Sequence, residues 1–190
     1  LTKKLIETDL KISWSTHLRF EDSLLDNKVW KDAEQSGCKF LHMGFETGSE
    51  RVLRLMGKAT TTKQIQRSLE FSSKHGVWNH VMGFFGFPGE TYEDAKSSML
   101  FLENNREHIH SIGFGTFDLT KYSPVMKNAE KFGVTYNKNP DWDFALDYYY
   151  TTKEGLGIES AGQVLDEFEQ NHHRGWDLRI YIREYLFLYI

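Results

Sequence analysis

Three short stretches, each rich in glycine or in charged residues, could bind a small charged ligand. The first, GFFGFPGE, covers residues 83–90 and ends an apolar run in a Gly-Phe-Pro-Gly turn. Glycine permits positive φ and the close approach of a ligand to the backbone, while proline stiffens the turn. The alternative interpretation is an ordinary tight connection between a strand and a helix.

Glu46 belongs to the second stretch, GFETGSERVLRLMGK, which covers residues 44–58. A carboxylate at the end of a strand could accept hydrogen bonds from the hydroxyl or amino groups of a ligand, and backbone N–H groups near Ser49 could meet a ligand carboxylate. Lys58 could reach back to the same place as a cation. In the alternative interpretation, Glu46 pairs with a neighbouring arginine and Lys58 is solvated.

His17 and Arg19 belong to the third stretch, WSTHLRFED, and follow a short β-favouring run. An arginine or histidine at a strand end could hold a substrate or a ligand carboxylate. The alternative is a salt bridge with Glu21 or Asp22.

Metal binding by this chain is not expected. His108 and His110 form one close pair of histidines, and His172 and His173 another, but neither pair has carboxylate or cysteine partners at ligand spacing. Cys38 is the only cysteine, so the chain can form neither an internal disulfide nor, by itself, a thiolate-ligated cluster. A lone thiol suits a reducing compartment, which favours a cytoplasmic location.

The composition predicts a folded domain that does not enter membranes. The 190 residues include 14 Phe, 9 Tyr and 5 Trp, enough to build a hydrophobic core, and the formal net charge is -4. No block of like charges indicates a nucleic-acid partner, and no apolar run approaches the ~18 residues of a membrane span.

Four mostly apolar runs alternate with helical patterns along the first two-thirds of the chain. Continuous apolar strands indicate a sheet covered on both faces, and the alternation predicts a parallel α/β sheet, open or curled into a barrel. Ligands of such sheets bind at the carboxyl ends of the strands, where the three stretches lie. We predict strands over residues 11–15, 38–46, 77–87 and 111–119, and helices over residues 21–35, 49–58, 61–76 and 91–108.

The composition and the residue pattern of the sequence change near Asn137. Residues 137–150 are rich in aromatic and turn residues, residues 159–173 have the pattern of a capped amphipathic helix, and residues 176–190 favour another helix. We therefore predict a (βα) barrel part over residues 1–136 and an α-rich appendage over residues 137–190.

The order of these segments resembles the radical S-adenosylmethionine (SAM) superfamily. The likeness extends over about residues 10–125 and is greatest to the group in which such domains often follow a cobalamin-binding domain. The sequence is also similar to methylthiotransferases and to oxygen-independent coproporphyrinogen oxidases. The segments of this sequence that carry the resemblance are WSTHLR, GCKFLHMGFETGSERVLRLMGKATTTKQI, GFFGFPGETYEDAKSSMLFL and FGTFDLTKYSP.

The resemblance implies a partial (βα)6 barrel of TIM type, with the four strands here as its third to sixth. It also implies contacts to SAM. Glu46 would meet the ribose or the amino-acid moiety, Lys58 the carboxylate, and Arg19 a further part of the cofactor or the substrate. The segment that would line the adenine and ribose contains Met82, Gly83, Gly86 and Phe87.

The family's [4Fe-4S] cluster is held by a C-x3-C-x2-C motif, which this sequence lacks. We therefore expect a C-terminal part of a radical SAM enzyme, inactive alone, with a degenerate relative as the alternative. The intact protein would cleave SAM reductively to a 5′-deoxyadenosyl radical and modify an unidentified small-molecule substrate. With cobalamin as a further cofactor, the outcome would be a methylation.

Two other interpretations compete with this one. The chain could be a non-catalytic (βα) binding or interaction module whose exposed sheet edge pairs with a second copy. It could also be an unrelated barrel enzyme that uses Glu46 and His17 as acid and base. In the radical SAM interpretation, the carboxyl ends of the four strands form one shared rim that binds SAM. This interpretation requires Glu46, Lys58 and the bend at Gly86 to point toward one side of the molecule.

Overall fold

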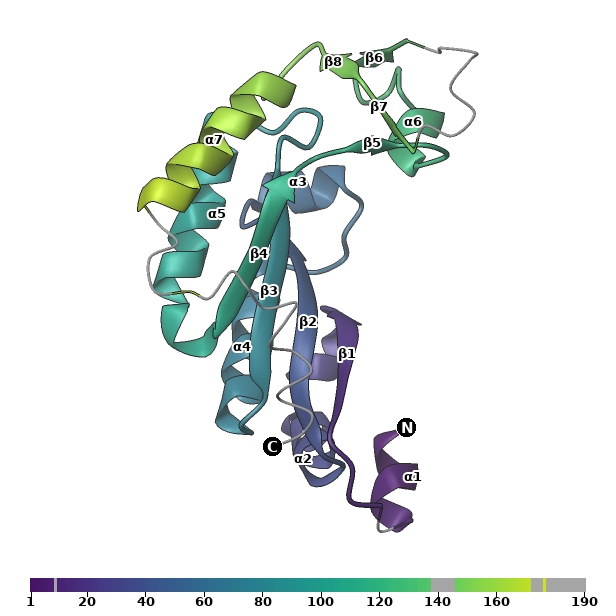
Figure 1. Ribbon diagram of the computed structural model, residues 1–190, viewed down its shortest axis with the longest axis vertical. Coiled ribbons are helices and arrows are strands. Elements are labelled where there is room, and N and C mark those ends of the chain that lie inside the picture. The colour runs from purple at the N-terminus through teal and green to yellow at the C-terminus, as the bar shows by residue number, and fades with distance from the viewer. Residues whose placement is uncertain (9, 138–145, 172–175, 177–190) are drawn as a thin grey trace.

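Four parallel strands form the central sheet of the protein, in the order β1-β2-β3-β4 (Figure 1). The computed structural model describes residues 1–8, 10–137, 146–171 and 176. All three strand pairs are parallel, as predicted, and within this part of the chain the sheet does not close into a barrel. The strands are β1 (Trp14–Arg19), β2 (Cys38–Glu46), β3 (Trp78–Phe85) and β4 (Ser111–Thr116).

Helices connect successive strands, and polar side chains fix where most of these helices begin. Asp26 and Ser49 accept hydrogen bonds from backbone N–H groups in the first turns of α2 and α3. Thr61 and Thr91 form capping boxes at α4 and α5. The helices are α1 (Thr2–Glu7), η1 (Asp22–Leu25), α2 (Asn27–Gln35), α3 (Glu50–Leu55), α4 (Thr62–Lys74), α5 (Tyr92–Asn104) and η2 (Arg106–His108).

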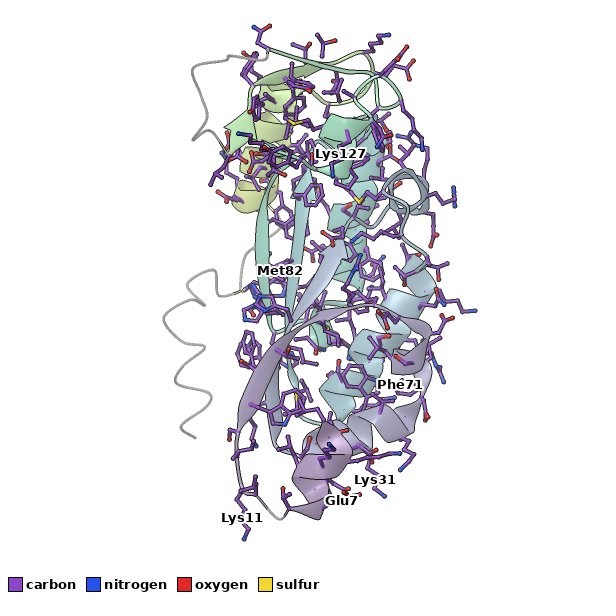
Figure 2. All side chains as sticks on the ribbon, turned by 90° about the vertical axis from the view of Figure 1, so that its right-hand side faces the viewer. Glu7, Lys11, Lys31, Phe71, Met82 and Lys127 are labelled. Carbon is purple, nitrogen blue, oxygen red and sulfur yellow. The ribbon has the colours of Figure 1, made fainter. Side chains whose placement is uncertain are left out.

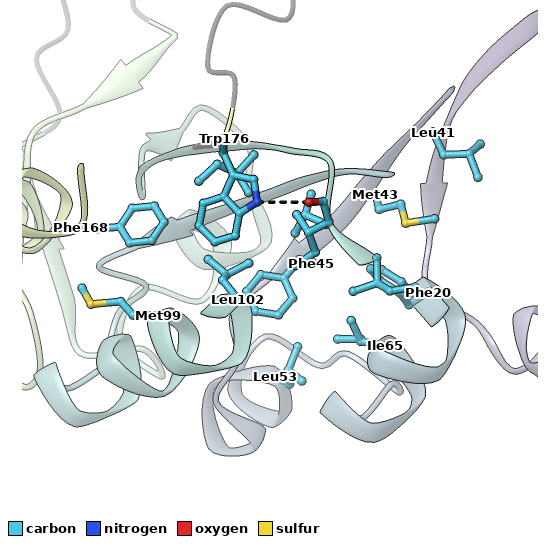
Figure 3. Close-up of a cluster of buried hydrophobic side chains, with 14 of the residues drawn as sticks. Phe20, Leu41, Met43, Phe45, Leu53, Ile65, Met99, Leu102, Phe168 and Trp176 are labelled. Carbon is cyan, nitrogen blue, oxygen red and sulfur yellow. Dashed lines mark hydrogen bonds between the residues drawn. The ribbon is translucent and has the colours of Figure 1, made fainter. Parts of the chain in front are cut away.

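The two faces of the sheet differ in chemistry. Alternate side chains of a strand point to opposite faces, and Leu41, Met43 and Phe45 of β2 pack into the core formed with the helices (Figure 3). We call the opposite face the inner face. Figure 2 shows Met82 on the inner face, with Phe71 of α4 and Lys31 of α2 beyond the other face.

Of the predicted strands of the sheet and the helices that connect them, only the strand at residues 38–46 has the predicted bounds, and two others differ for a clear physical reason. The strand predicted at residues 11–15 lies at Trp14–Arg19. We expected a polar turn at Thr16 and His17 to end this strand, but both residues pair with β2, so that prediction is wrong. The helix predicted at residues 21–35 is divided into η1 and α2, because Asp26 caps a new helix there.

The described part of the chain after β4 contains short strands that the sequence did not predict. Leu119–Thr120 (β5) pairs with Asp147–Tyr148 (β7), and Val134–Tyr136 (β6) pairs with Tyr150–Thr152 (β8), both antiparallel. A short helix, α6 (Pro124–Lys127), lies between β5 and β6. These pairs span the boundary predicted near residue 137, and the division into two domains stays a prediction.

Helix α7 (Ile158–Asn171) confirms the helix predicted at residues 159–173. Its Phe168 contacts Phe85 and Phe114, so it covers the same face of the sheet as α5. The helix predicted at residues 176–190 lies outside the described residues except for Trp176, whose Nε1 donates a hydrogen bond to the carbonyl of Ile109 (Figure 3). None of the described helices has both the length and the apolar character needed to cross a bilayer.

We predict that Gly86→Ala lowers the free energy of unfolding by about 3 kcal/mol, measured by urea denaturation. Gly86 has φ +87°, and a Cβ atom there would lie 2.5 Å from Cβ of Ala161 in α7. Gly115→Ala is the control, since its Cβ would meet nothing within 4 Å. A G86A variant as stable as the G115A variant would contradict this packing of α7.

Candidate functional site

An ion pair between Glu46 and Lys58 occupies the carboxyl end of β2. Nζ of Lys58 lies 2.7 Å from Oε1 of Glu46, and the two side chains are 25% and 24% exposed. The alternative in which Glu46 pairs with an arginine and Lys58 is solvated is therefore wrong. The pair joins two residues that the sequence placed at one ligand site.

Local backbone geometry brings this pair together. Glu46 has φ 66°, a conformation that residues other than glycine rarely adopt. A Cβ atom at Gly44 would lie 3.1 Å from Oε1 of Glu46, so the absence of a side chain leaves room for the carboxylate. Gly57, at φ 70°, turns the chain after α3 and brings Lys58 back toward the strand.

Arg19 and Lys58 line a cavity of about 210 Å³ beside this ion pair. Its remaining lining comes from the loops that follow β1 and α3, with Gly44 from β2. Two cations therefore meet at the carboxyl ends of β1 and β2, with Glu46 bonded to Lys58 and Glu21 also lining the cavity. This arrangement can hold a ligand that carries both a carboxylate and an amino group.

His17 takes a different position from the one that the sequence suggested. It lies within β1 and stacks on His42 of β2, with ring centroids 4.3 Å apart. Asp22, considered as an ion-pair partner, accepts a hydrogen bond from Nε2 of Gln64. Since Glu46 is paired with Lys58, the structure does not bring His17 and Glu46 into contact as an acid and base pair.

Met82 and Gly83 lie on opposite faces of β3. Met82 pairs with Gly44 of β2 and Gly113 of β4, which places it on the inner face, one strand away from the cavity. Gly83 faces the helices, where a Cβ atom would lie 2.7 Å from the ring of Phe114. The need for glycine at position 83 thus has a packing cause.

Gly86 and Phe87 are packed against protein rather than exposed at the cavity. Ala161 of α7 makes the close approach to Gly86 that we had expected of a ligand. Phe87 is 5% exposed and contacts the rings of Phe117 and Phe132. The structure therefore brings Arg19, Glu46 and Lys58 together and leaves ligand contacts of Gly86 and Phe87 as a prediction.

Glu90 is a buried carboxyl group that the sequence analysis missed. It is fully buried, and its Oε2 accepts a hydrogen bond from the N–H of Gly86, while its Oε1 has no hydrogen-bond partner. Burial raises the pKa of Glu90 to about 7, and the nearby charge of Asp94 acts in the same direction. Its place inside the GFPGE turn, directly before a helix cap, was the available signal.

The residues of this chain do not fit an iron–sulfur cluster. Cys38 is buried at the start of β2, and burial raises the pKa of its thiol to about 12, so the thiol is protonated at neutral pH. Among the described residues no group of three or more His, Cys, Asp or Glu side chains could hold a metal ion. A cluster would need cysteines that these 190 residues do not contain.

Comparison with protein families gives a match that contains this whole site. The model of the Radical SAM superfamily matches residues 2–102. An uncharacterized methyltransferase of Pyrococcus horikoshii is 30% identical over 103 residues, which are 53% of this chain and 22% of that protein.

Two further comparisons agree with this match. A tRNA-2-methylthio-N(6)-dimethylallyladenosine synthase of Sulfurihydrogenibium sp. is 33% identical over 100 residues, which cover 51% of this chain and 21% of that enzyme. The chain spans about a fifth of the length of both curated relatives. A solved structure of the cobalamin-dependent S-adenosylmethionine radical enzyme OxsB with aqua-cobalamin bound has a TM-score of 0.66 at 16% identity, over 90% of this chain and 31% of that one. This likeness confirms the fold predicted from the sequence.

We predict that Glu90→Gln removes a pH dependence of stability. The folded-state pKa of Glu90, about 7, lies above the ordinary value of 4.5. Its ionisation therefore destabilises the fold, and the stability that is present below pH 4.5 is lost as the pH rises through 7. Between pH 4.5 and 8 the wild type should lose about 3 kcal/mol relative to E90Q, measured by urea denaturation at each pH. Parallel stability curves for the two proteins would contradict the shift.

Proposed function

This chain belongs to the radical SAM superfamily, and we propose that it forms the SAM-binding part of a radical SAM enzyme. The observation that carries the proposal is the meeting of Arg19, Glu46 and Lys58 at the carboxyl ends of two parallel strands. In open α/β sheets, this end of the strands is where ligands bind.

The charges of the site complement the amino-acid end of SAM. Lys58 and Arg19 would bind the carboxylate, and Glu46 would accept hydrogen bonds from the amino group or the ribose hydroxyls. When SAM binds, the ligand carboxylate would replace Glu46 as the partner of Lys58, and the ligand amino group would replace Lys58 as the partner of Glu46. The ion pair of the free site thus keeps two charges oriented until the cofactor replaces it.

Met82 would supply an apolar surface next to these charges. It follows Arg19 and Gly44 in one row across the inner face of the sheet. Gly44 and Gly113 flank it on both sides, so the strand neighbours of Met82 carry no side chains. The flat adenine ring could lie in this row against the thioether, with the ribose beside it.

The chemistry that follows SAM binding belongs to the intact enzyme. There, a [4Fe-4S] cluster held by residues outside this chain would supply the electron for reductive cleavage of SAM to a 5′-deoxyadenosyl radical. This chain lacks the cysteines of the cluster motif, so the part of its own residues would be to bind and orient SAM. We expect these 190 residues to be inactive alone.

The likeness to a methyltransferase and to a cobalamin-dependent enzyme supports a radical methylation as the outcome. The substrate would be a small molecule held over the same rim. A non-catalytic interaction module is the second candidate, because among the described strands the edge strand β1 pairs with β2 alone.

We predict that the full-length protein, reconstituted anaerobically with iron and sulfide and then reduced, converts SAM to 5′-deoxyadenosine. The product is measured by liquid chromatography, with unreduced protein as the control. A fully loaded, reduced sample that yields no 5′-deoxyadenosine would exclude the radical enzyme and favour the interaction module.

We also predict that Lys58→Met weakens SAM binding by the full-length protein about tenfold, because the carboxylate loses a charge-assisted partner. Equilibrium dialysis with labelled SAM measures the dissociation constant. Lys74→Met is the matched control, since Lys74 is exposed at the far end of α4. Equal affinities of the K58M and K74M variants would remove Lys58 from the site.

A further inference from the structure

We propose that Asp94 is a positioning residue that ties the loop after β2 to the loop after β3 and so holds the cofactor site in shape. The inference rests on the proposed function, because the first of these loops directly follows Glu46, the last residue of β2. Asp94 lies in the first turn of α5 and does not line the cavity beside Lys58.

One carboxylate collects hydrogen bonds from both loops. Its Oδ1 accepts from Oγ of Ser49 at 2.6 Å and from Nε of Arg51 at 3.3 Å, and its Oδ2 accepts from Nη2 of Arg51. Its Oδ2 also accepts from the N–H and the hydroxyl of Thr91, at 2.9 and 2.6 Å. Ser49 and Arg51 follow β2, and Thr91 follows β3, so this side chain joins the two connections.

Arg51 extends the tie to the glycine-rich turn itself. Its Nη2 donates a second hydrogen bond to the carbonyl of Gly89, at 2.6 Å. The guanidinium thus spans from the first turn of α3 to the turn after β3. Its rigid, planar donors suit this double contact better than a lysine would.

A second contact, between uncharged groups, also joins the loop after β2 to α5. Oγ of Ser98 in α5 lies 3.0 Å from Oγ1 of Thr47 and accepts from the N–H of Gly48 at 2.8 Å. Ser98 is 1% exposed and Thr47 is fully buried. The three residues that follow Glu46 are therefore bonded to α5, so a shift of α5 would move Glu46.

Asp94 is suited to this role because it stays ionised. Burial disfavours its charge, but the hydrogen bonds from Arg51, Ser49 and Thr91 lower its pKa well below the usual range. A capping box commonly uses Glu or Gln at this position. The shorter Asp fits a carboxylate that must cap α5 and also meet α3.

Amide hydrogen exchange of the 190-residue chain tests the tie directly. In Asp94→Asn and Arg51→Gln, we expect exchange to rise about tenfold at residues 46–50 and 86–91 together, because a charge-assisted contact is lost. Thr91→Ala is the matched control, since it removes the α5 cap but leaves Ser49 and Arg51 bonded to Asp94. If D94N and T91A both raise exchange in the first turn of α5 alone, the tie does not exist.

SAM binding by the full-length protein separates positioning from general stability. We expect D94N and R51Q to raise the SAM dissociation constant about tenfold, R51K to recover part of it, and T91A to lower the melting temperature at nearly wild-type affinity. Affinities that follow melting temperature across all four variants would overturn the positioning role. A wild-type protein that binds no SAM refutes the proposed function, while the exchange experiment still decides whether the tie exists.

Discussion

The parallel register of β1, β2 and β3 is the constraint on which the rest of the site depends. It places Arg19, Gly44 and Met82 side by side in one row of the sheet, level with the carboxyl end of β1. Since parallel strands all end at one edge, any polar residue that follows them faces the same rim. The function of the site then depends on how the connecting loops are held over that edge. A shift of the strand register by one residue would turn the side chains of Arg19 and Met82 to the helix-covered face.

Local sequence signals predicted the elements at the centre of the sheet. The strand Cys38–Glu46 has the bounds that its apolar run indicated, and Ser49 caps α3 as its residue type suggested. Such features depend on neighbours a few residues apart. By contrast, β1 continues through Thr16 and His17 because β2 offers hydrogen bonds to them, and a polar stretch alone does not reveal a distant partner.

In the candidate site, too, the contacts between residues close in sequence were predictable and the contacts with distant residues were not. Glu46 and Lys58 are separated by one short helix, so their meeting follows from local structure. The neighbours of Gly86 and Glu90 come from far along the chain: Ala161 fills the space at the glycine, and Leu156 donates its N–H to the carbonyl of Glu90. A glycine-rich turn permits close approach, but the sequence does not tell whether a ligand or a helix makes that approach.

Glu90 and Asp94 lie close together in the sequence but have different surroundings. The two carboxyl groups are four residues apart, yet their pKa values move in opposite directions. Asp94 meets a guanidinium and several hydrogen-bond donors, so it remains an anion that can tie α3 and α5 together. Glu90 is fully buried beside Gly86, and burial and the charge of Asp94 both favour its neutral form. The turn therefore directs its permanent charge toward the loop after β2, while the carboxyl group whose charge is disfavoured lies beside Gly86, the glycine against which Ala161 of α7 packs.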